Sequence, residues 1–297
     1  MTELVPFTPD QTEQVVALWR SLHADWTWLD EPEARKRAFE EIPDFHRTLL
    51  VLRRGGRIAA TFTSGYAKNG RGPRNRHIGI EVMPEDVGDW IMPVLAELAE
   101  ADRAHPGTWH IARMDDRAIA ALAPRLAVAG FAFHSTNVRM RWEGESVSLV
   151  DPGPIRIETY TGGDAAVDQA IAALHDQGYR TSRVVPQANV PDMWRAIPGA
   201  TCHEMLLAWD GDRLVGFIEY LAVKGEAWVN SLVVARSHWG TPAAAAIGTR
   251  AMQRLFEAGH RTIESYVRSN NAASIKLQIK LGWRKHSETS GVYVREL

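Results

Sequence analysis

The spacing of one strand end and two glycines is the same in both halves of the chain. In the first half, glycines follow the apolar run ending at Val82 by 6 and 48 residues, and in the second half they follow Val234 at the same two distances. The offset of 152 residues between the two patterns is far longer than a solenoid repeat of about 20–50 residues. The chain has 297 residues, enough for two domains of about 150 residues each. We therefore expect two similar domains in tandem.

The residues between these landmarks predict the order of secondary structure in the first half. The sequence Thr8-Pro9-Asp10-Gln11 is typical of a helix start, because it combines a capping box with proline at the first helical position. Two apolar runs around Gly55-Gly56 predict a β-hairpin. The pattern then predicts a strand at 77–82, a helix at 88–104, a strand at 109–112, a helix at 118–128 and a strand within 131–140.

The second half repeats this order. A strand at 156–160 precedes a helix capped by Asp164, and the apolar runs 205–209 and 214–218 predict another hairpin. A strand at 228–234, a helix at 243–258, a strand at 262–268 and a helix at 271–281 follow, and Tyr293-Val294 is expected to close this sheet.

The repeated order predicts the α/β fold class, with a mixed sheet that carries helices on its faces. Chain-breaking residues at 143–154 indicate a linker between the two repeats. We therefore expect an N-terminal domain at 1–145 and a C-terminal domain at 154–297.

The composition excludes several classes of protein. Lys and Arg number 34 against 36 Asp and Glu, so the chain lacks the basic excess of a nucleic-acid-binding protein. No uncharged apolar run approaches the roughly 18 residues of a membrane span, and the N-terminus lacks the features of a signal peptide. The lone Cys202 excludes an internal disulfide, and the 11 histidines fit no metal-binding motif. We expect a soluble cytoplasmic protein that binds no metal, nucleic acid or membrane.

The stretch after Val234 has the features of an anion site. A strand ends there, a short loop containing Gly240 follows, and a helix of small residues begins. Backbone N–H groups at the start of a helix lack partners, and the helix dipole favours negative charge beside them. Glycine alone does not distinguish such a site from an ordinary strand-to-helix turn, so the hypothesis depends on the rest of the second half.

A second segment supports the hypothesis. The residues from Asn271 through Ser274 and Gln278 to Gly282-Trp283 resemble the last conserved motif of the GNAT acyltransferase superfamily, Asn-x-x-Ala-x-x-x-Tyr-x-x-x-Gly-Phe, with its spacing kept. The loop after Val234 resembles the acetyl-CoA loop of the same superfamily. The resemblance covers most of both halves, and it indicates a tandem GNAT protein similar to the two-domain type that includes mycothiol synthase.

This resemblance implies a function and a set of binding residues. The function is transfer of an acyl group from acetyl-CoA, or another acyl-CoA, to the amine of a small molecule or peptide, by direct attack of the amine on the thioester. The residues implied in CoA binding are Leu232, Val233 and Val234 on the strand, Trp239, Gly240, Thr241, Ala243 and Ala244 in the loop and helix start, and Asn271 and Gln278 on the last helix.

The second half departs from the superfamily's pattern at positions that matter for chemistry. Trp239 and Pro242 stand where a basic or amide residue and a glycine are usual, and Gln278 stands where a tyrosine often protonates the leaving thiolate. The usual position of the general base is Asn230, whose amide cannot ionise. The candidates for catalysis are therefore Asn230 itself and residues of the neighbouring strands, namely Glu219, Tyr220 and Tyr266, with His203 or Glu204 nearby.

The first half keeps the strand and one glycine but places Asp86 and Asp89 in the corresponding loop, where carboxylates repel an anion. We therefore expect CoA to bind in the second half only, and the first half to be structural.

Two alternatives for the function of the chain stay open. One is a catalytically inactive GNAT-like binding protein, and the other is a GNAT-like scaffold that uses CoA thioesters for decarboxylation or transfer to an alcohol. Acceptor-binding segments are expected at 23–46 and 176–203.

Overall fold

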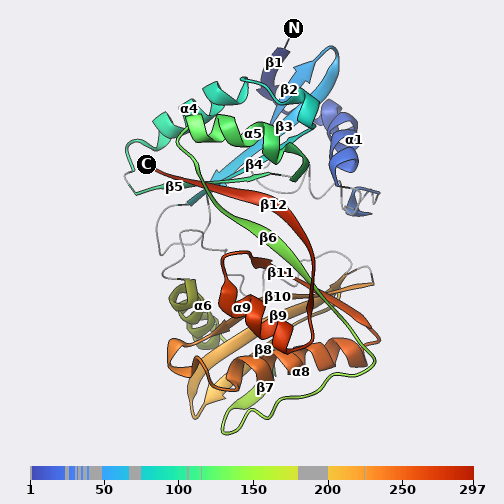
Figure 1. The fold of residues 1–297 in the computed structure, drawn as a ribbon, viewed down its shortest axis with the longest axis vertical. Coiled ribbons are helices and arrows are strands. Elements are labelled where there is room, and N and C mark those ends of the chain that lie inside the picture. The colour runs from blue at the N-terminus through green and yellow to red at the C-terminus, as the bar shows by residue number, and fades with distance from the viewer. Residues whose placement is uncertain are drawn as a thin grey trace. The chain divides into compact units, whose positions relative to one another are not determined.

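The computed structural model describes residues 2–23, 27–30, 32, 35, 39, 49–66, 75–105, 107–114, 116–179, 200–223 and 225–297. These residues form two compact units. The first unit contains the described residues up to Thr136 together with Thr289–Leu297, and the second contains Asn137–Glu288. Each unit is a mixed sheet that carries helices, which confirms the expected α/β fold class (Figure 1).

The first unit follows the predicted element order. Its strands are β1 (Thr2–Pro6), β2 (Leu49–Arg54), β3 (Arg57–Tyr66), β4 (Asn75–Val82) and β5 (Trp109–Met114), adjacent in that order. Its helices are α1 (Thr12–Leu22), α4 (Ile91–Asp102) and α5 (Asp116–Val128). The predicted capping box is present, and its proline begins a short 3-10 turn, Pro9–Gln11, directly before α1.

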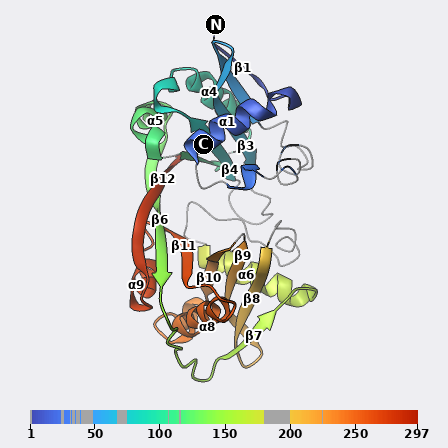
Figure 2. The ribbon, with the colours of Figure 1, turned by 90° about the vertical axis from the view of Figure 1, so that its right-hand side faces the viewer.

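The second unit repeats the pattern. Its elements are β7 (Arg156–Tyr160), α6 (Ala165–Tyr179), β8 (Ala200–Asp210), β9 (Arg213–Val223), β10 (Glu226–Val234), α8 (Ala243–Glu257), β11 (Thr262–Arg268) and α9 (Ala272–Lys280). Strands β11, β10, β9 and β8 follow one another across this unit (Figure 2). Asp164 caps α6 as predicted, because its Oδ1 accepts from the backbone N–H of Ala166 at 2.9 Å.

The last strand of each sequence repeat lies in the sheet of the other unit. Strand β6 (Ala132–Glu143) follows α5 in the first half, yet its residues from Asn137 pair antiparallel with β11 of the second unit. Strand β12 (Arg284–Glu296) follows α9 in the second half, yet its residues from Gly291 pair antiparallel with β5 of the first unit. Figure 1 shows green β6 beside β11 and the red end of β12 beside β5.

This exchange corrects one expectation. Tyr293-Val294 pairs with Ala112 and Ile111 of the first unit, so it does not close the sheet of the second half. The compact units also differ from a division at residues 145 and 154, because each unit takes a strand from the other repeat. The boundaries 1–145 and 154–297 stay a prediction for the sequence repeats.

The exchanged strands supply core residues. Val138, Met140 and Trp142 of β6 are buried in the hydrophobic core of the second unit, and Tyr293 of β12 is buried in that of the first. Burying one such side chain contributes about 1.5–3 kcal/mol. The exchange therefore makes each unit depend on a segment from the other half of the chain.

The second glycine of each repeat, Gly130 or Gly282, has a backbone conformation that favours glycine. Gly130 follows α5 with φ +83°, and Gly282 follows α9 with φ +86°. A residue with a Cβ adopts this left-handed conformation only at a cost, and glycine adopts it freely. In each repeat, the glycine turns the chain from a helix into the exchanged strand.

A buried charge network fastens β12 to the first unit. Arg295 donates to the carbonyl oxygens of Leu95 at 2.9 Å and Ala129 at 2.8 Å, and to Nδ1 of His110 at 2.9 Å. Nε2 of His110 lies 2.7 Å from Asp102 Oδ2. Since Nδ1 accepts and Nε2 faces a carboxylate, His110 is the neutral tautomer with its proton on Nε2.

Within the described residues, no helix combines the length and hydropathy needed to cross a bilayer.

The strand exchange predicts that the two halves fold together. We expect residues 1–150 and residues 151–297, expressed separately, to lack cooperative unfolding, because each fragment exposes the edge that the other fragment covers. Co-expressed, the fragments should purify as a one-to-one complex. Size-exclusion chromatography and urea denaturation provide the measurement. A monomeric 151–297 fragment that unfolds as cooperatively as the full chain would contradict the exchange.

The His110 network predicts acid sensitivity. Burial, aided by the charge of Arg295, lowers the pKa of His110 from 6.5 despite its hydrogen bond to Asp102. The unfolded state therefore binds more protons below about pH 6.5, and the free energy of unfolding should fall there by up to about 1.4 kcal/mol per pH unit until the folded-state pKa is passed. Urea denaturation of the wild type and His110→Gln between pH 8 and pH 5 measures this. An equal slope in both proteins would contradict the assignment.

Candidate active site

Strands β10 and β11 separate soon after they begin. Their parallel ladder pairs Ala227 with Ile263 and Trp228 with Glu264, and among the described residues it extends no further. Beyond Trp228, β10 continues to Val234 and β11 to Arg268. We call the gap between these two diverging strands the fork. It leaves one edge of each strand open to a ligand that carries amide groups.

The corresponding strands of the first unit do not separate. Strands β4 and β5 pair in register from Asn75 opposite Trp109 to Ile80 opposite Met114. By the repeated spacing, Ile80 corresponds to Leu232, so the ladder in the first unit continues through the positions that diverge in the second. Within the part of the chain that the structure describes, the second unit has a fork and the first does not.

A β-bulge at Asn230 accompanies the divergence. The pairing of β10 with β9 shifts between Val229 and Ser231, which leaves Asn230 as the extra residue. Its Nδ2 donates to Oε2 of Glu219 at 2.6 Å. His203 Nε2 lies 3.0 Å from the other carboxylate oxygen of Glu219. Asn230, which cannot ionise, therefore lies against the carboxylate of Glu219 on the adjacent strand.

Glu219 is buried, with 1% of its surface exposed. Its burial is compensated by donors on both oxygens, as a buried charge requires. A carboxylate has about four lone-pair sites, so these two contacts leave capacity to accept a further proton or hydrogen bond.

Tyr220 lies on the opposite face of β9 from Glu219, because side chains alternate along a strand. It is fully buried, and its hydroxyl donates to Glu204. Burial, with the hydrogen bond to Glu204, raises the pKa of Tyr220 far above its usual range. Burial also raises the pKa of Cys202 to about 11. Both groups are neutral at pH 7 and are poorly suited to proton transfer.

Tyr266 of β11 and Trp228 of β10 stack at the base of the fork, with ring centroids 5.4 Å apart and planes inclined by 20°. Arg139 of β6 places its guanidinium 5.6 Å from the Trp228 ring and donates through Nε to Glu264 at 2.7 Å. Arg141 donates to the other oxygen of Glu264 at 2.8 Å. Sequence reasoning missed these two arginines, because they belong to the first half of the chain and only the strand exchange brings them here.

The loop after β10 presents unpaired donors. Among the described residues, no partner is found for the backbone N–H groups of Gly240, Ala244 and Ala245. Gly240 has φ +81°, which turns the loop into α8. The other predicted loop donors are taken. The N–H of Thr241 donates to the carbonyl oxygen of His238 at 3.3 Å, and the N–H of Ala243 donates to the Thr241 hydroxyl at 3.3 Å.

Trp239 covers one acceptor at the fork. The N–H of Ala235 donates to Val215 on the β9 side, so the alternation of a strand turns the carbonyl of Val234 toward the fork. Nε1 of Trp239 donates to that carbonyl at 3.0 Å, and the guanidinium of Arg236 lies 5.3 Å from its ring. The side chain is 61% exposed, so it rests on the strand edge and is not packed into the core.

The remaining predicted binding residues lie around the same end of the sheet. Leu232 is partly buried against the core, and Val233 packs on α6, where a Cβ at Gly178 would meet its Cγ1 at 2.7 Å. Asn271 caps α9 by accepting from the N–H of Ser274 at 3.1 Å. Gln278 accepts from the hydroxyl of Ser265, on β11, at 2.9 Å.

The loop after β4 in the first unit does not carry the two unpaired negative charges that its sequence predicts. Asp86 is buried and accepts from Arg57 at 2.8 Å, and Asp89 pairs with Arg125 at 3.0 Å. Arginines thus neutralise both carboxylates. The paired strands β4 and β5 are therefore a stronger obstacle to a ligand than repulsion by these aspartates.

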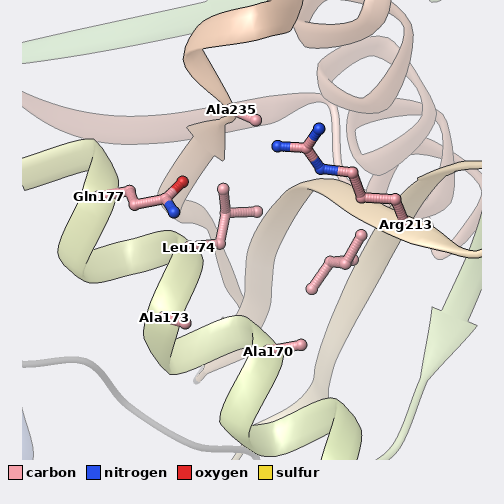
Figure 3. Close-up of a pocket in the computed structure, with 7 residues that line it drawn as sticks. Ala170, Ala173, Leu174, Gln177, Arg213 and Ala235 are labelled. Atoms are coloured by element: carbon pink, nitrogen blue, oxygen red, sulfur yellow. The ribbon is translucent and has the colours of Figure 1, made fainter.

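A hollow of about 220 Å³ lies between α6 and the turn that begins β9. Figure 3 shows Leu174 and Gln177 of α6 on one side and Arg213 on the other, with Ala235 at the end of β10. Most ligand pockets measure roughly 300–1,000 Å³, so this hollow is too small for CoA. The segments 23–46 and 176–203, expected to bind the acceptor, lie mostly outside the described residues.

The sequence of residues 165–283 matches the family described as the acetyltransferase (GNAT) family. A comparison with curated proteins finds no match.

Solved structures share the fold of the whole chain. The GCN5-related N-acetyltransferase from Sphaerobacter thermophilus is 16% identical with a TM-score of 0.67, over 99% of this chain and 95% of that one. A tandem GNAT protein from the clavulanic acid biosynthesis pathway is 15% identical with a TM-score of 0.65, over 100% and 98%. A protein from Enterococcus faecalis V583, described as a probable N-acyltransferase, is 11% identical with a TM-score of 0.63, over 100% and 72%.

The second half of the chain therefore matches the GNAT acetyltransferase family over residues 165–283, and the chain as a whole shares the fold of solved tandem GNAT proteins.

Proposed function

We propose that this protein transfers an acyl group from acyl-CoA to an amine, and that the second unit alone carries the reaction. The observation that carries the proposal is the fork between β10 and β11, which ends at a loop with three unpaired N–H groups. The first unit has paired strands in the corresponding place.

The residues of the second unit fit CoA. The N–H groups of Gly240, Ala244 and Ala245 would hold the diphosphate, with the positive end of the α8 dipole behind them. The open edge of β10 at Leu232–Val234 would receive the amides of the pantetheine arm, beside Asn271 and Gln278 on α9. Pro242 lacks an N–H but caps a helix start, where that group has no partner in any case.

Trp239 must release the carbonyl of Val234 before a ligand amide can use it. The cost is small, because one exposed hydrogen bond contributes about 0.5–1.5 kcal/mol. This lowers affinity by about tenfold at most. Trp239 therefore weakens CoA binding without closing the site.

When bound, acyl-CoA supplies a thioester carbonyl that an amine can attack. One C–N bond forms and one C–S bond breaks. The leaving CoA thiolate takes one proton from the attacking nitrogen, and before the attack the ammonium form of the acceptor loses another proton. We assign that proton to Glu219, which Asn230 and His203 hold beside the bulge. Backbone N–H groups of β10 polarise the carbonyl as charge develops on its oxygen. Tyr266 and Tyr220 remain catalytic candidates from the sequence, and the raised pKa of Tyr220 counts against it.

The role of Glu219 predicts the effect of Glu219→Gln. The amide can still accept from His203 but cannot take a proton, and loss of a general base lowers kcat by about 100-fold or more. Acyl transfer is followed by the release of CoA thiol with acetyl-CoA and a panel of primary amines. Glu257→Gln is the matched control, because Glu257 lies exposed at the end of α8 and contacts Gln253, and it should change kcat by less than about threefold. Equal loss in both variants would contradict the assignment.

The loop predicts opposite effects of Ala244→Glu on folding and on binding. A carboxylate in the first turn of a helix stabilises it by about 0.3–1 kcal/mol, so Tm should stay equal or rise. The same charge should repel the diphosphate and weaken CoA binding at least tenfold. Calorimetric titration of CoA into Ala244→Glu and the neutral control Ala244→Gln measures this. Unchanged affinity in the glutamate variant would place the diphosphate elsewhere.

A further inference from the structure

Trp239, in the loop between β10 and α8, keeps most of its ring open to solvent. The side chain is 61% exposed. Within the described part of the chain it has two contacts, the bond from Nε1 to the carbonyl of Val234 at 3.0 Å and the guanidinium of Arg236, 5.3 Å from the ring centroid. A cation beside an indole lies over one of its faces, so the other face is open to a flat ligand.

This ring lies beside the backbone donors to which we assign the diphosphate. Trp239 directly precedes Gly240, whose N–H has no partner among the described residues, and the same holds for Ala244 and Ala245. Consecutive Cα atoms are about 3.8 Å apart, so the Trp239 side chain begins at the edge of this group of donors. In CoA the ribose and the adenine ring follow directly on the diphosphate. A diphosphate bound at these donors therefore brings the adenine ring within reach of the indole.

The charged groups of this loop also fit a phosphorylated ligand. In the described part of the chain, the guanidinium of Arg236 lies over the indole and forms no ion pair. The carboxylate of Asp210 is turned to His238 of the same loop, with 3.2 Å between Oδ2 and Nε2. Stacking of a nucleobase on an aromatic side chain, with a cation from arginine beside it, is a common way of binding nucleotides. Trp239 and Arg236 together supply both parts.

We propose that Trp239 is the stacking surface for the adenine ring of CoA. This rests on the proposed function, which places the pantetheine arm on the edge of β10. When an amide of that arm takes the carbonyl of Val234, the indole loses its hydrogen bond there and stacks on the adenine ring. Trp239 therefore acts in opposite directions on the two halves of the ligand, because it competes with the pantetheine arm and binds the nucleotide.

Calorimetric titration of the two halves of CoA, each by itself, tests this. Trp239→Leu should bind adenosine 3′,5′-bisphosphate at least about fivefold more weakly than the wild type, because the stack is lost. The same variant should bind phosphopantetheine more tightly, by up to about tenfold, because the carbonyl of Val234 is free. Trp239→Phe keeps a ring without the N–H, so it should retain the nucleotide affinity and gain phosphopantetheine affinity. Phe133→Leu, which removes an exposed aromatic ring of the first unit, is the control and should change neither.

The opposite signs separate stacking from a merely structural role, which would weaken the binding of both halves. Weaker binding of both in Trp239→Leu, unchanged nucleotide affinity in that variant, or no binding of the nucleotide to the wild type at millimolar concentration overturns the inference. Release of CoA thiol from acetyl-CoA with a panel of amines, measured on the wild type, tests the proposed function separately. The opposite signs without turnover support the stack and count against acyl transfer alone, whereas turnover without them overturns the stack alone.

Discussion

The separation of β10 and β11 after Trp228 is the constraint on which the site depends. A bulge at Asn230 shifts the register of β10 against β9, and a stacked pair of rings spans the point where the strands part. If the ladder continued, the backbone groups along this edge of β10 would pair with β11, as those of β4 pair with β5 in the first unit. Two repeats with the same element order thus differ in the feature that we propose admits a ligand. Strands β10 and β11 lose their pairing in the second unit, and the described residues of β4 and β5 stay paired in the first.

The exchanged strands explain how the first half can matter to a site in the second. Strand β6 contributes Met140 and Trp142 to the second core, and on its other face it contributes Arg139 and Arg141 beside the fork. Strand β12 is fastened to the first unit by Arg295, which satisfies two carbonyl oxygens and His110. The first half of the chain therefore contributes to the structure of the second unit, because it supplies β6 to that unit and receives β12 from the second half.

Local features of the fold could be predicted from the sequence, and the pairing of distant segments could not. The Asp164 cap, the hairpin around Gly211 and the helix that ends before Gly282 each depend on a few adjacent residues, and the structure has them where periodicity and turn chemistry place them. The sequence predicts the wrong sheet for Tyr293, because an apolar alternation specifies a strand but not its neighbour. In the site, Gly240 and Ala244 could be found from the strand-loop-helix pattern. The contact of Asn230 with Glu219, the bond from Trp239 to Val234 and the placement of Arg139 depend on a bulge, a side-chain rotamer and a strand exchange that the sequence does not display.

If only the open pair of strands binds CoA, as we propose, each chain has one CoA site. Calorimetric titration of CoA into the full chain therefore gives the most direct test. We expect a single site per chain, filled together with a change in the fluorescence of Trp239 as its indole leaves the carbonyl of Val234. Two sites per chain, or no heat with millimolar CoA, would contradict the claim that the fork is what distinguishes the second unit from the first.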